Sequence, residues 1–113
     1  GCMLGIHDGK FFFSLASAEN PSLTYLMAPT VLEKGKMSHV VGTYDGRAMR
    51  LYVDGVKVAQ SDEQQGGLLV DENSWLTVGA YKDNNELYRL KGAIKAATIY
   101  EGVLDAKAVE AAR

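Results

Sequence analysis

Hydrophobic and polar residues alternate along residues 39–59, on both sides of two Asp-Gly pairs. An Asp-Gly pair between alternating runs favours a tight hairpin turn, because glycine adopts positive φ without steric cost. The pattern therefore predicts three consecutive antiparallel strands. A two-residue turn at the second pair places Val53 opposite Val56, and two positions further along it places Leu51 opposite Val58. The predicted buried face consists of Met49, Leu51, Val53, Val56 and Val58, with Val40, Gly42 and Tyr44 from the preceding strand.

The opposite face of this ribbon is more polar and is predicted to meet water or a ligand. It carries Arg50, Tyr52, Lys57 and Ala59, with His39, Val41 and Thr43 from the preceding strand. A histidine, an arginine and a tyrosine on one open face could bind a hydroxylated or acidic sugar through hydrogen bonds. The alternative is that these three side chains satisfy one another or a crossing loop.

The remaining pattern predicts further short strands and a single helix. Residues 3–16 read as a hairpin with Asp8-Gly9 at its tip, which pairs Leu4 with Phe13 and leaves Phe12 on the other face. Further strands are predicted at residues 23–28, 37–44, 75–81 and 87–100, the last with a β-bulge before Ala97, and residues 68–70 are predicted to return to the core. Asp105 is a suitable N-cap for a helix over residues 105–113. These elements indicate an all-β sandwich or barrel.

Length and charge restrict the function classes. The 113 residues suit one domain, so residues 1–113 are predicted to form a single unit. Twelve basic and fourteen acidic residues are interspersed, which argues against nucleic acid as a partner. There is no apolar run near the ~18 residues that a membrane helix needs, so no membrane insertion is expected. A single cysteine, Cys2, cannot form an internal disulfide.

Several segments resemble a laminin G-like, concanavalin A-like lectin/glucanase domain. They are residues 37–46, 51–55, 76–79 and 90–94, with Ile99-Tyr100 and Leu104. The resemblance covers residues 3–112 and implies an antiparallel jelly-roll β-sandwich with one short C-terminal helix. Two departures matter: Met37 stands where the family usually carries a tryptophan, and the family's opening strands have no counterpart before Gly1.

A sandwich without its opening strands would leave a sheet edge and apolar surface bare. Three explanations are open: the chain is a fragment of a larger protein, the sandwich is smaller than usual, or a second copy completes it. We expect completion by a second copy or by the rest of a longer parent chain.

Catalysis is not expected, although glucanases share the fold that the resemblance implies. Retaining glycosidases need two carboxylates ~5 Å apart, which on a sheet means acidic residues spaced along one strand. No predicted strand offers such a pair, and the Glu-x-Asp-x-x-Glu pattern of laminarinase-like enzymes is absent from the sequence. The chain is therefore predicted not to be an enzyme.

The polar loop after the predicted strand at residues 75–81 carries the best candidate for sugar binding. Sugar-binding modules stack an aromatic ring on a pyranose and use Asn or Asp for the hydroxyls. The candidate residues are Trp75, Tyr81, Asp83, Asn84, Asn85 and Tyr88. The oxygen ligands Asp83, Asn85 and Glu86 could also hold calcium, which laminin G-like domains often bind, although such residues equally suit a solvated turn.

The resemblance and these residues predict a non-catalytic binding module of a secreted or surface protein, in an extracellular, cell-surface or periplasmic location. It would recognise carbohydrate or a glycosylated partner through loops at the edge of the sandwich. Two alternatives are a structural or protein-interaction module without sugar affinity, and an accessory domain of a polysaccharide-active enzyme.

Overall fold

The computed structural model describes residues 2–69, 80–82, 87–89, 92–99 and 105–112. The chain divides into two compact units. The first unit comprises residues 1–69 and 102–113, and the second comprises residues 70–101.

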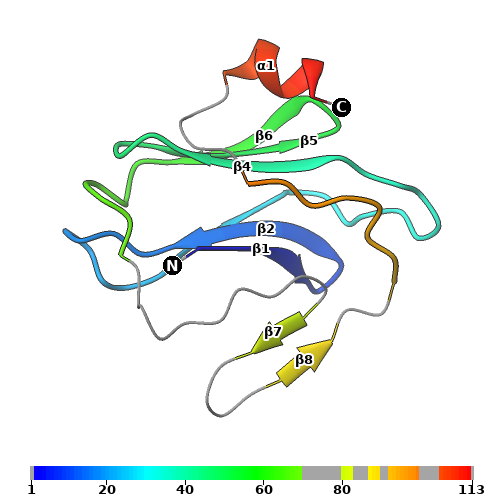
Figure 1. Cartoon of the computed structure of the whole chain (residues 1–113), viewed down its shortest axis with the longest axis horizontal. Helices are drawn as coiled ribbons and strands as arrows, with labels where there is room; N and C mark the ends of the chain where they lie inside the picture. Colours follow the sequence, from blue (N-terminus) through cyan, green and yellow to red (C-terminus); the bar gives the residue numbers. More distant parts are fainter. Residues whose placement is uncertain (1, 70–79, 83–86, 90–91, 100–104, 113) are drawn as a thin grey trace. The chain divides into compact units, whose positions relative to one another are not determined.

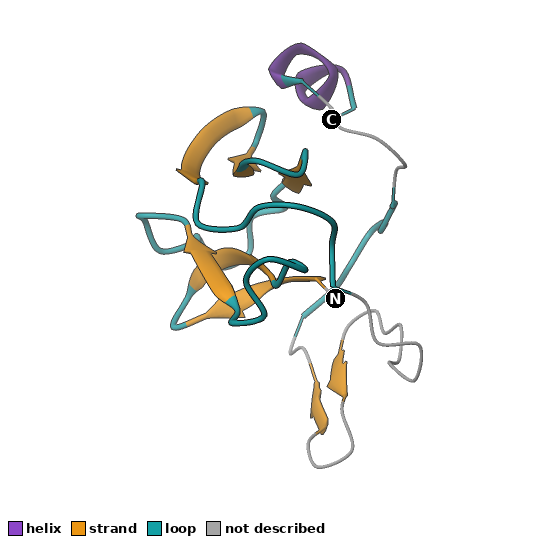
Figure 2. Ribbon diagram, turned by 90° about the vertical axis from the view of Figure 1, so that its left-hand side faces the viewer, coloured by secondary structure: helices purple, strands orange, loops and turns teal. Residues whose placement is uncertain are grey.

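The first unit contains two three-stranded antiparallel sheets that lie in two layers (Figures 1 and 2). One sheet has the order β1 (Cys2–His7), β2 (Lys10–Leu15) and β3 (Thr24–Met27), and the other has the order β4 (Val40–Tyr44), β5 (Met49–Val53) and β6 (Val56–Ser61). A short helix, α1 (Ala106–Ala111), follows Asp105, whose side chain accepts a hydrogen bond from the amide of Ala108. The predicted all-β sandwich with one C-terminal helix is confirmed.

The two Asp-Gly turns with two-residue loops have the backbone that the sequence predicts. Asp8 and Asp54 both have φ of 50°, and the glycines that follow them also have positive φ. Both turns therefore match the type I′ geometry that suits the twist of a hairpin. The register of the first hairpin pairs Leu4 with Phe13, as predicted. The third Asp-Gly pair lies in a longer connection between Tyr44 and Met49, which are register partners.

The core lies between the two sheets and includes residues from both. Its buried members are Phe13, Leu15, Leu26, Ala28, Met49 and Leu51. The ring of Phe13 lies directly against the backbone of β4, because a Cβ atom on Gly42 would be 2.5 Å from the ring. Glycine at this position therefore allows the two sheets to approach each other. Burial of Met49 and Leu51 agrees with the predicted inner face.

The pairing of β5 with β6 corrects the predicted register. Val53 pairs with Val56, but a β-bulge then pairs Leu51 with Ala59 instead of Val58. A continuous register would have placed Gln60 opposite the fully buried Met49. The extra residue instead brings Ser61 opposite Met49. Val58 is half-buried, and Val56 is 63% exposed and so lies outside the predicted buried face.

The outer face of the β4–β5–β6 sheet is also less open than predicted. Tyr52 is only 3% exposed, although the alternation placed it on a face open to water or a ligand. Figures 1 and 2 show α1 on this side of the sheet, away from β1, β2 and β3. The helix contacts β6, and its Val109 is fully buried. The local pattern of a strand does not reveal that a distant helix packs on it.

In the second unit, β7 (Ala80–Lys82) pairs antiparallel with β8 (Leu87–Arg89). The predicted strand over residues 87–100 is wrong beyond residue 89 in the described part, because residues 92–99 form no strand and are exposed. The predicted bulge before Ala97 is accordingly wrong. Residues 75–79 of the other predicted strand lie outside the described residues.

The segment that leaves β6 was predicted to return to the core at residues 68–70. Leu68 and Leu69 are exposed, so this prediction is wrong for both residues, and residue 70 is not described. Leu68 instead forms an isolated antiparallel bridge with Ser17, and the amide of Leu69 donates to the carbonyl of Ala16. This segment is therefore held by its backbone and not by burial of its leucines.

Candidate binding site

The predicted sugar-binding residues fall at the β7–β8 hairpin and before it. Tyr81 and Tyr88 are register partners, and the next pair, Lys82 and Leu87, closes the connection 83–86. The other predicted residues, which are Trp75, Asp83, Asn84, Asn85 and the calcium candidate Glu86, lie outside the described residues. Within the described ranges, no group of three or more His, Cys, Asp or Glu side chains is arranged to hold a metal ion. Calcium binding stays a prediction.

The second candidate, the face with His39, Arg50 and Tyr52, does not form an open polar cluster. Tyr52 is buried, and His39 precedes β4, where its backbone amide donates to Asp54 Oδ1 over 3.0 Å. Its Nδ1 atom is buried and has no hydrogen-bond partner in the described part of the chain. The guanidinium of Arg50 pairs with Asp45 instead. The predicted face is therefore unsuited to bind a sugar through all three side chains.

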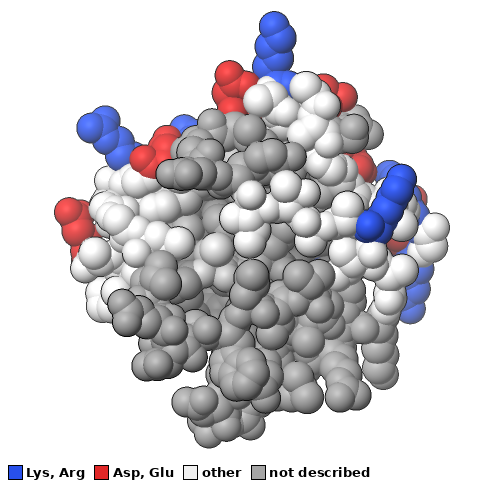
Figure 3. Space-filling view, viewed as in Figure 1, with Lys and Arg blue, Asp and Glu red and all other residues white. Residues whose placement is uncertain are grey.

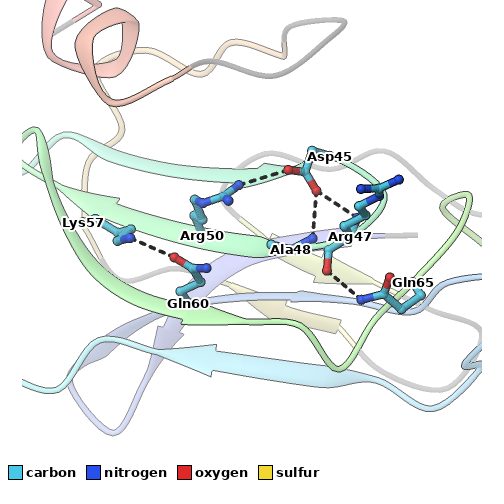
Figure 4. A network of polar contacts seen from close by, with 7 residues as sticks. All are labelled: Asp45, Arg47, Ala48, Arg50, Lys57, Gln60 and Gln65. Carbon is cyan, nitrogen blue, oxygen red and sulfur yellow. Dashed lines mark hydrogen bonds and ion pairs between the residues drawn. The ribbon is translucent and has the colours of Figure 1, made fainter.

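Asp45 is the centre of a polar network at the β4–β5 turn (Figure 4). Its Oδ1 accepts hydrogen bonds from the amides of Arg47 and Ala48, each over 2.8 Å, and its Oδ2 lies 3.2 Å from Nη1 of Arg50. The two backbone donors, followed by Arg50, lower the pKa of Asp45 from 3.8 to about 2. Because the carboxylate is used by its own turn, this network is structural.

Gln64 is a buried polar residue that the sequence pattern did not reveal. Its Oε1 atom accepts from the amide and the hydroxyl of Ser17, over 2.8 and 2.7 Å. Its Nε2 atom donates to the carbonyl of Ser22 over 2.6 Å and to Oγ1 of Thr24 over 3.0 Å. Nothing in the polar run Ser-Asp-Glu-Gln-Gln-Gly-Gly distinguishes Gln64 from Gln65 beside it. The side chain connects the segment after β6 to the loop before β3.

A hollow of about 340 Å³ lies on the outer face of the β1–β2–β3 sheet. Among the described residues it is lined by His7, Phe12, Tyr25 and Met27. The alternation of β2 assigns Phe12 to the face away from the core, but no single segment of the sequence shows that β1 and β3 bring His7 and Tyr25 beside it. Three strands are needed to form this hollow.

Charged side chains of both signs are spread over the described surface in Figure 3. This agrees with the interspersed charges of the sequence, whose formal net charge is −2. No helix in the described part of the chain is both long enough and apolar enough to cross a membrane.

Comparison with curated proteins identifies two relatives that match part of the chain. Pappalysin-1 of Mus musculus is 38% identical over 76 residues, and that of Homo sapiens is 37% identical over 76 residues. Each match covers 60% of this chain, which spans only 5% of the length of pappalysin-1.

Structural comparison finds the same fold in a bacterial protein. Residues 221–444 of an S-layer domain-containing protein from Clostridium thermocellum match with a TM-score of 0.62 and 21% identity, over 93% of this chain and 52% of that one. A family model described as the concanavalin A-like lectin/glucanases superfamily, of laminin G type, matches residues 1–110. With its two antiparallel sheets and this match over almost its whole length, the chain belongs to the concanavalin A-like lectin/glucanases superfamily.

Proposed function

We propose that residues 1–113 form one non-catalytic binding module of an extracellular, cell-surface or periplasmic protein. The module recognises carbohydrate or a glycosylated partner through loops at the edge of the fold. Membership of a superfamily described by its lectins supports the ligand class. The S-layer domain in the name of the bacterial structure supports a location at the cell surface.

The observation that carries this proposal is the register of the β7–β8 hairpin. Tyr81 and Tyr88 are paired one step from the connection 83–86, which has the sequence Asp-Asn-Asn-Glu. Two aromatic residues next to a run of carboxylate and amide groups combine a stacking surface with hydrogen-bonding groups for hydroxyls. We assign Trp75, Asp83, Asn84 and Asn85 to the same site.

The strands support a non-catalytic role. None of the eight described strands contains an aspartate or a glutamate. Glycoside hydrolysis by the usual mechanism needs two carboxyl groups on opposite sides of the scissile bond. A module that only binds its ligand needs no such pair.

The test is binding of the full chain to polysaccharides in affinity gels, with the variants Trp75→Ala and Asn84→Ala. Loss of one hydrogen bond or one stacked ring corresponds to about 0.5–1.5 kcal/mol, so each variant should bind roughly 3- to 10-fold more weakly. Asn73→Ala is the matched control, since Asn73 lies outside the proposed set, and it should bind like the wild type. Equal retardation of all three variants would contradict the assignment of the site.

Calcium is tested by thermal unfolding with and without a chelator. A cation bound by Asp83, Asn85 and Glu86 stabilises the folded state by mass action, so calcium should raise the melting temperature and the Glu86→Gln variant should respond less. Identical melting curves in calcium and in chelator would contradict calcium binding at this loop.

Among the described strands β1 lies at the edge of its sheet, and this position favours a second candidate, a structural or protein-interaction module. Strand β1 contains no lysine, acidic residue or proline, which are the residues that commonly protect an edge, and its Leu4 and Ile6 are exposed. A second copy, or the rest of a longer parent chain, could pair with this edge. Absence of binding to every polysaccharide would favour this candidate, or that of an accessory domain of a polysaccharide-active enzyme.

A further inference from the structure

We propose that the hollow on the outer face of the β1–β2–β3 sheet binds a single neutral pyranose residue. The four described lining residues, His7, Phe12, Tyr25 and Met27, come from these three strands. The inference extends the proposed carbohydrate recognition to a second place on the chain.

The floor of the hollow is the ring of Phe12, which lies over Gly5 of the neighbouring strand. Phe12 and Gly5 are register partners, and a Cβ atom on Gly5 would be 2.8 Å from Cε1 of that ring. The absence of a side chain on Gly5 lets the ring lie down on the backbone of β1. A larger residue at position 5 would lift the ring, so this glycine maintains the depth of the hollow.

The wall of the hollow provides an exposed aromatic surface. Tyr25 is 55% exposed, and its ring centroid lies 5.7 Å from that of Phe12 at an interplanar angle of 53°. Met27 is the register partner of Phe12 and completes the apolar lining. An exposed ring beside an apolar floor suits the C–H face of a sugar, which is apolar although its edge is not.

The rim of the hollow has hydrogen-bonding groups and balanced charge. The side chain of His7 is 70% exposed, and its Nε2 atom lies 3.4 Å from Oδ2 of Asp8. Lys10 is the register partner of His7. The imidazole and the Tyr25 hydroxyl can both donate and accept hydrogen bonds, which suits sugar hydroxyls. Asp8 and Lys10 do not line the hollow, but both lie next to His7 and have opposite charges, so the charge beside the rim is balanced and favours a neutral ligand over an anionic one.

The volume of the hollow limits the size of the ligand. Ligand pockets usually measure about 300–1,000 Å³, and about 340 Å³ is at the lower end of that range. One pyranose ring fits such a volume, whereas a longer oligosaccharide would have to extend beyond it. The hollow therefore suits a terminal or single sugar residue.

The test is an NMR titration of the full chain, labelled at the methionine methyl groups, with methyl β-glucopyranoside, methyl β-galactopyranoside and methyl α-mannopyranoside. We expect a saturable shift of the Met27 methyl signal with at least one of them. Tyr25→Ser, which removes the stacked ring, should weaken this binding roughly 3- to 10-fold, whereas Tyr25→Phe, which keeps the ring, should weaken it by less. Gly5→Ala should also weaken it, because the lifted Phe12 ring fills the hollow.

The variant Asn84→Ala distinguishes this site from the loop site. The Met27 shift should persist in Asn84→Ala. If the shift disappears in this variant, the proposed sugar site in the hollow is wrong, while the proposed function of the chain is unaffected. Polysaccharide binding without any Met27 shift would also contradict sugar binding in the hollow, but not the proposed function of the chain. A Met27 shift with an apolar peptide, but with none of the three glycosides, would overturn the assigned ligand class. Unchanged circular dichroism of Tyr25→Ser would show that loss of the shift is not loss of the fold.

Discussion

Single residues decide how the polar stretches of this chain are used. Gln64 and Gln65 are adjacent in a run that contains no hydrophobic residue, yet only Gln64 is fully buried. Its amide makes four hydrogen bonds, to groups of Ser17, Ser22 and Thr24. Composition could not predict this, because burial of an amide depends on partners that the fold brings from 40 or more residues away.

We predict that Gln64→Leu destabilises the folded state. Leucine is apolar and one bond shorter than glutamine, so it cannot satisfy the amide of Ser17 or the carbonyl of Ser22, and each buried unpaired group costs about 1–3 kcal/mol. Urea unfolding should show a correspondingly lower midpoint. Gln65→Leu is the matched control: in the described part of the chain the Gln65 side chain bonds to the carbonyls of Arg47 and Asp62, near solvent, so its loss should have a much smaller effect. Equal destabilisation by both variants would contradict the role of Gln64.

The lowered pKa of Asp45 predicts a pH dependence of stability. Folding lowers the pKa of this carboxyl group from its ordinary value of 3.8, which we take for the unfolded chain, to about 2. Since the folded pKa is depressed, Asp45 contributes its full stabilisation above pH about 4, and this contribution is lost as pH falls toward about 2. The stability difference between wild type and Asp45→Asn should therefore shrink over that interval, as measured by urea unfolding at several pH values. A difference that stays constant down to pH about 2 would contradict this prediction.

At the scale of elements, contact between the two sheets depends on one position of β4. The Phe13 ring of one sheet lies against the Gly42 backbone of the other, and a Cβ atom there would be 2.5 Å from two ring carbons. The alternation predicted Gly42 on the inner face, but it could not predict which side chain fills the space that glycine leaves.

We predict that Gly42→Ala destabilises the folded state by about 1–3 kcal/mol, because a methyl group in a packed core forces the Phe13 ring and the strands to shift. Gly67→Ala is the control, since a Cβ atom on Gly67 meets no atom within 4 Å. Its effect should stay within about 0.5 kcal/mol, as for most surface substitutions. Thermal or urea unfolding measures both variants, and a Gly42→Ala variant as stable as the wild type would show that the sheets can separate without loss.

The predictions from sequence are correct where adjacent residues determine the structure, and they are wrong where distant residues determine it. The turns at Asp8-Gly9 and Asp54-Gly55 depend on two adjacent residues, and both form as expected. Tyr52 is buried on a face that alternation along the strand predicted to be open, and α1, more than 50 residues later in the chain, contacts the neighbouring strand β6. Residues 92–99 alternate like a strand but form none, since a strand also needs a neighbour to pair with.

At the scale of the whole molecule, sequence and structure agree on the fold class and the family, whereas the ligand site stays a prediction. The motifs of residues 37–46 and 51–55 resembled a concanavalin A-like domain, and the family match over residues 1–110 confirms it. Those motifs are turns and inward-facing residues, so they specify a scaffold and leave the site open. The site at the loop 83–86 stays a prediction from residue types.

The hollow at Tyr25, which we propose as a binding site, illustrates why a site is harder to predict than the fold that carries it. The sequence indicated that Phe12 faces away from the core, but His7, Phe12 and Tyr25 become neighbours only after β1, β2 and β3 have paired in register. An error of one position in either pairing would send Tyr25 or His7 to the other side of the sheet. Site prediction therefore requires every register to be correct, whereas the fold tolerates some errors.

The extra residue in β6 has a practical consequence for protein engineering. Lys57 and Gln60 lie three positions apart but share one side of the strand, where their side chains are hydrogen-bonded over 2.8 Å. A combinatorial library that randomises every second codon from Val56 onward would therefore mix solvent-facing and core-facing sites. A sequence without this bulge should be aligned to the hairpin with a one-residue gap after Lys57. In a peptide grafted onto β6, the alternation of inward and outward side chains would have to shift by one residue at the same point.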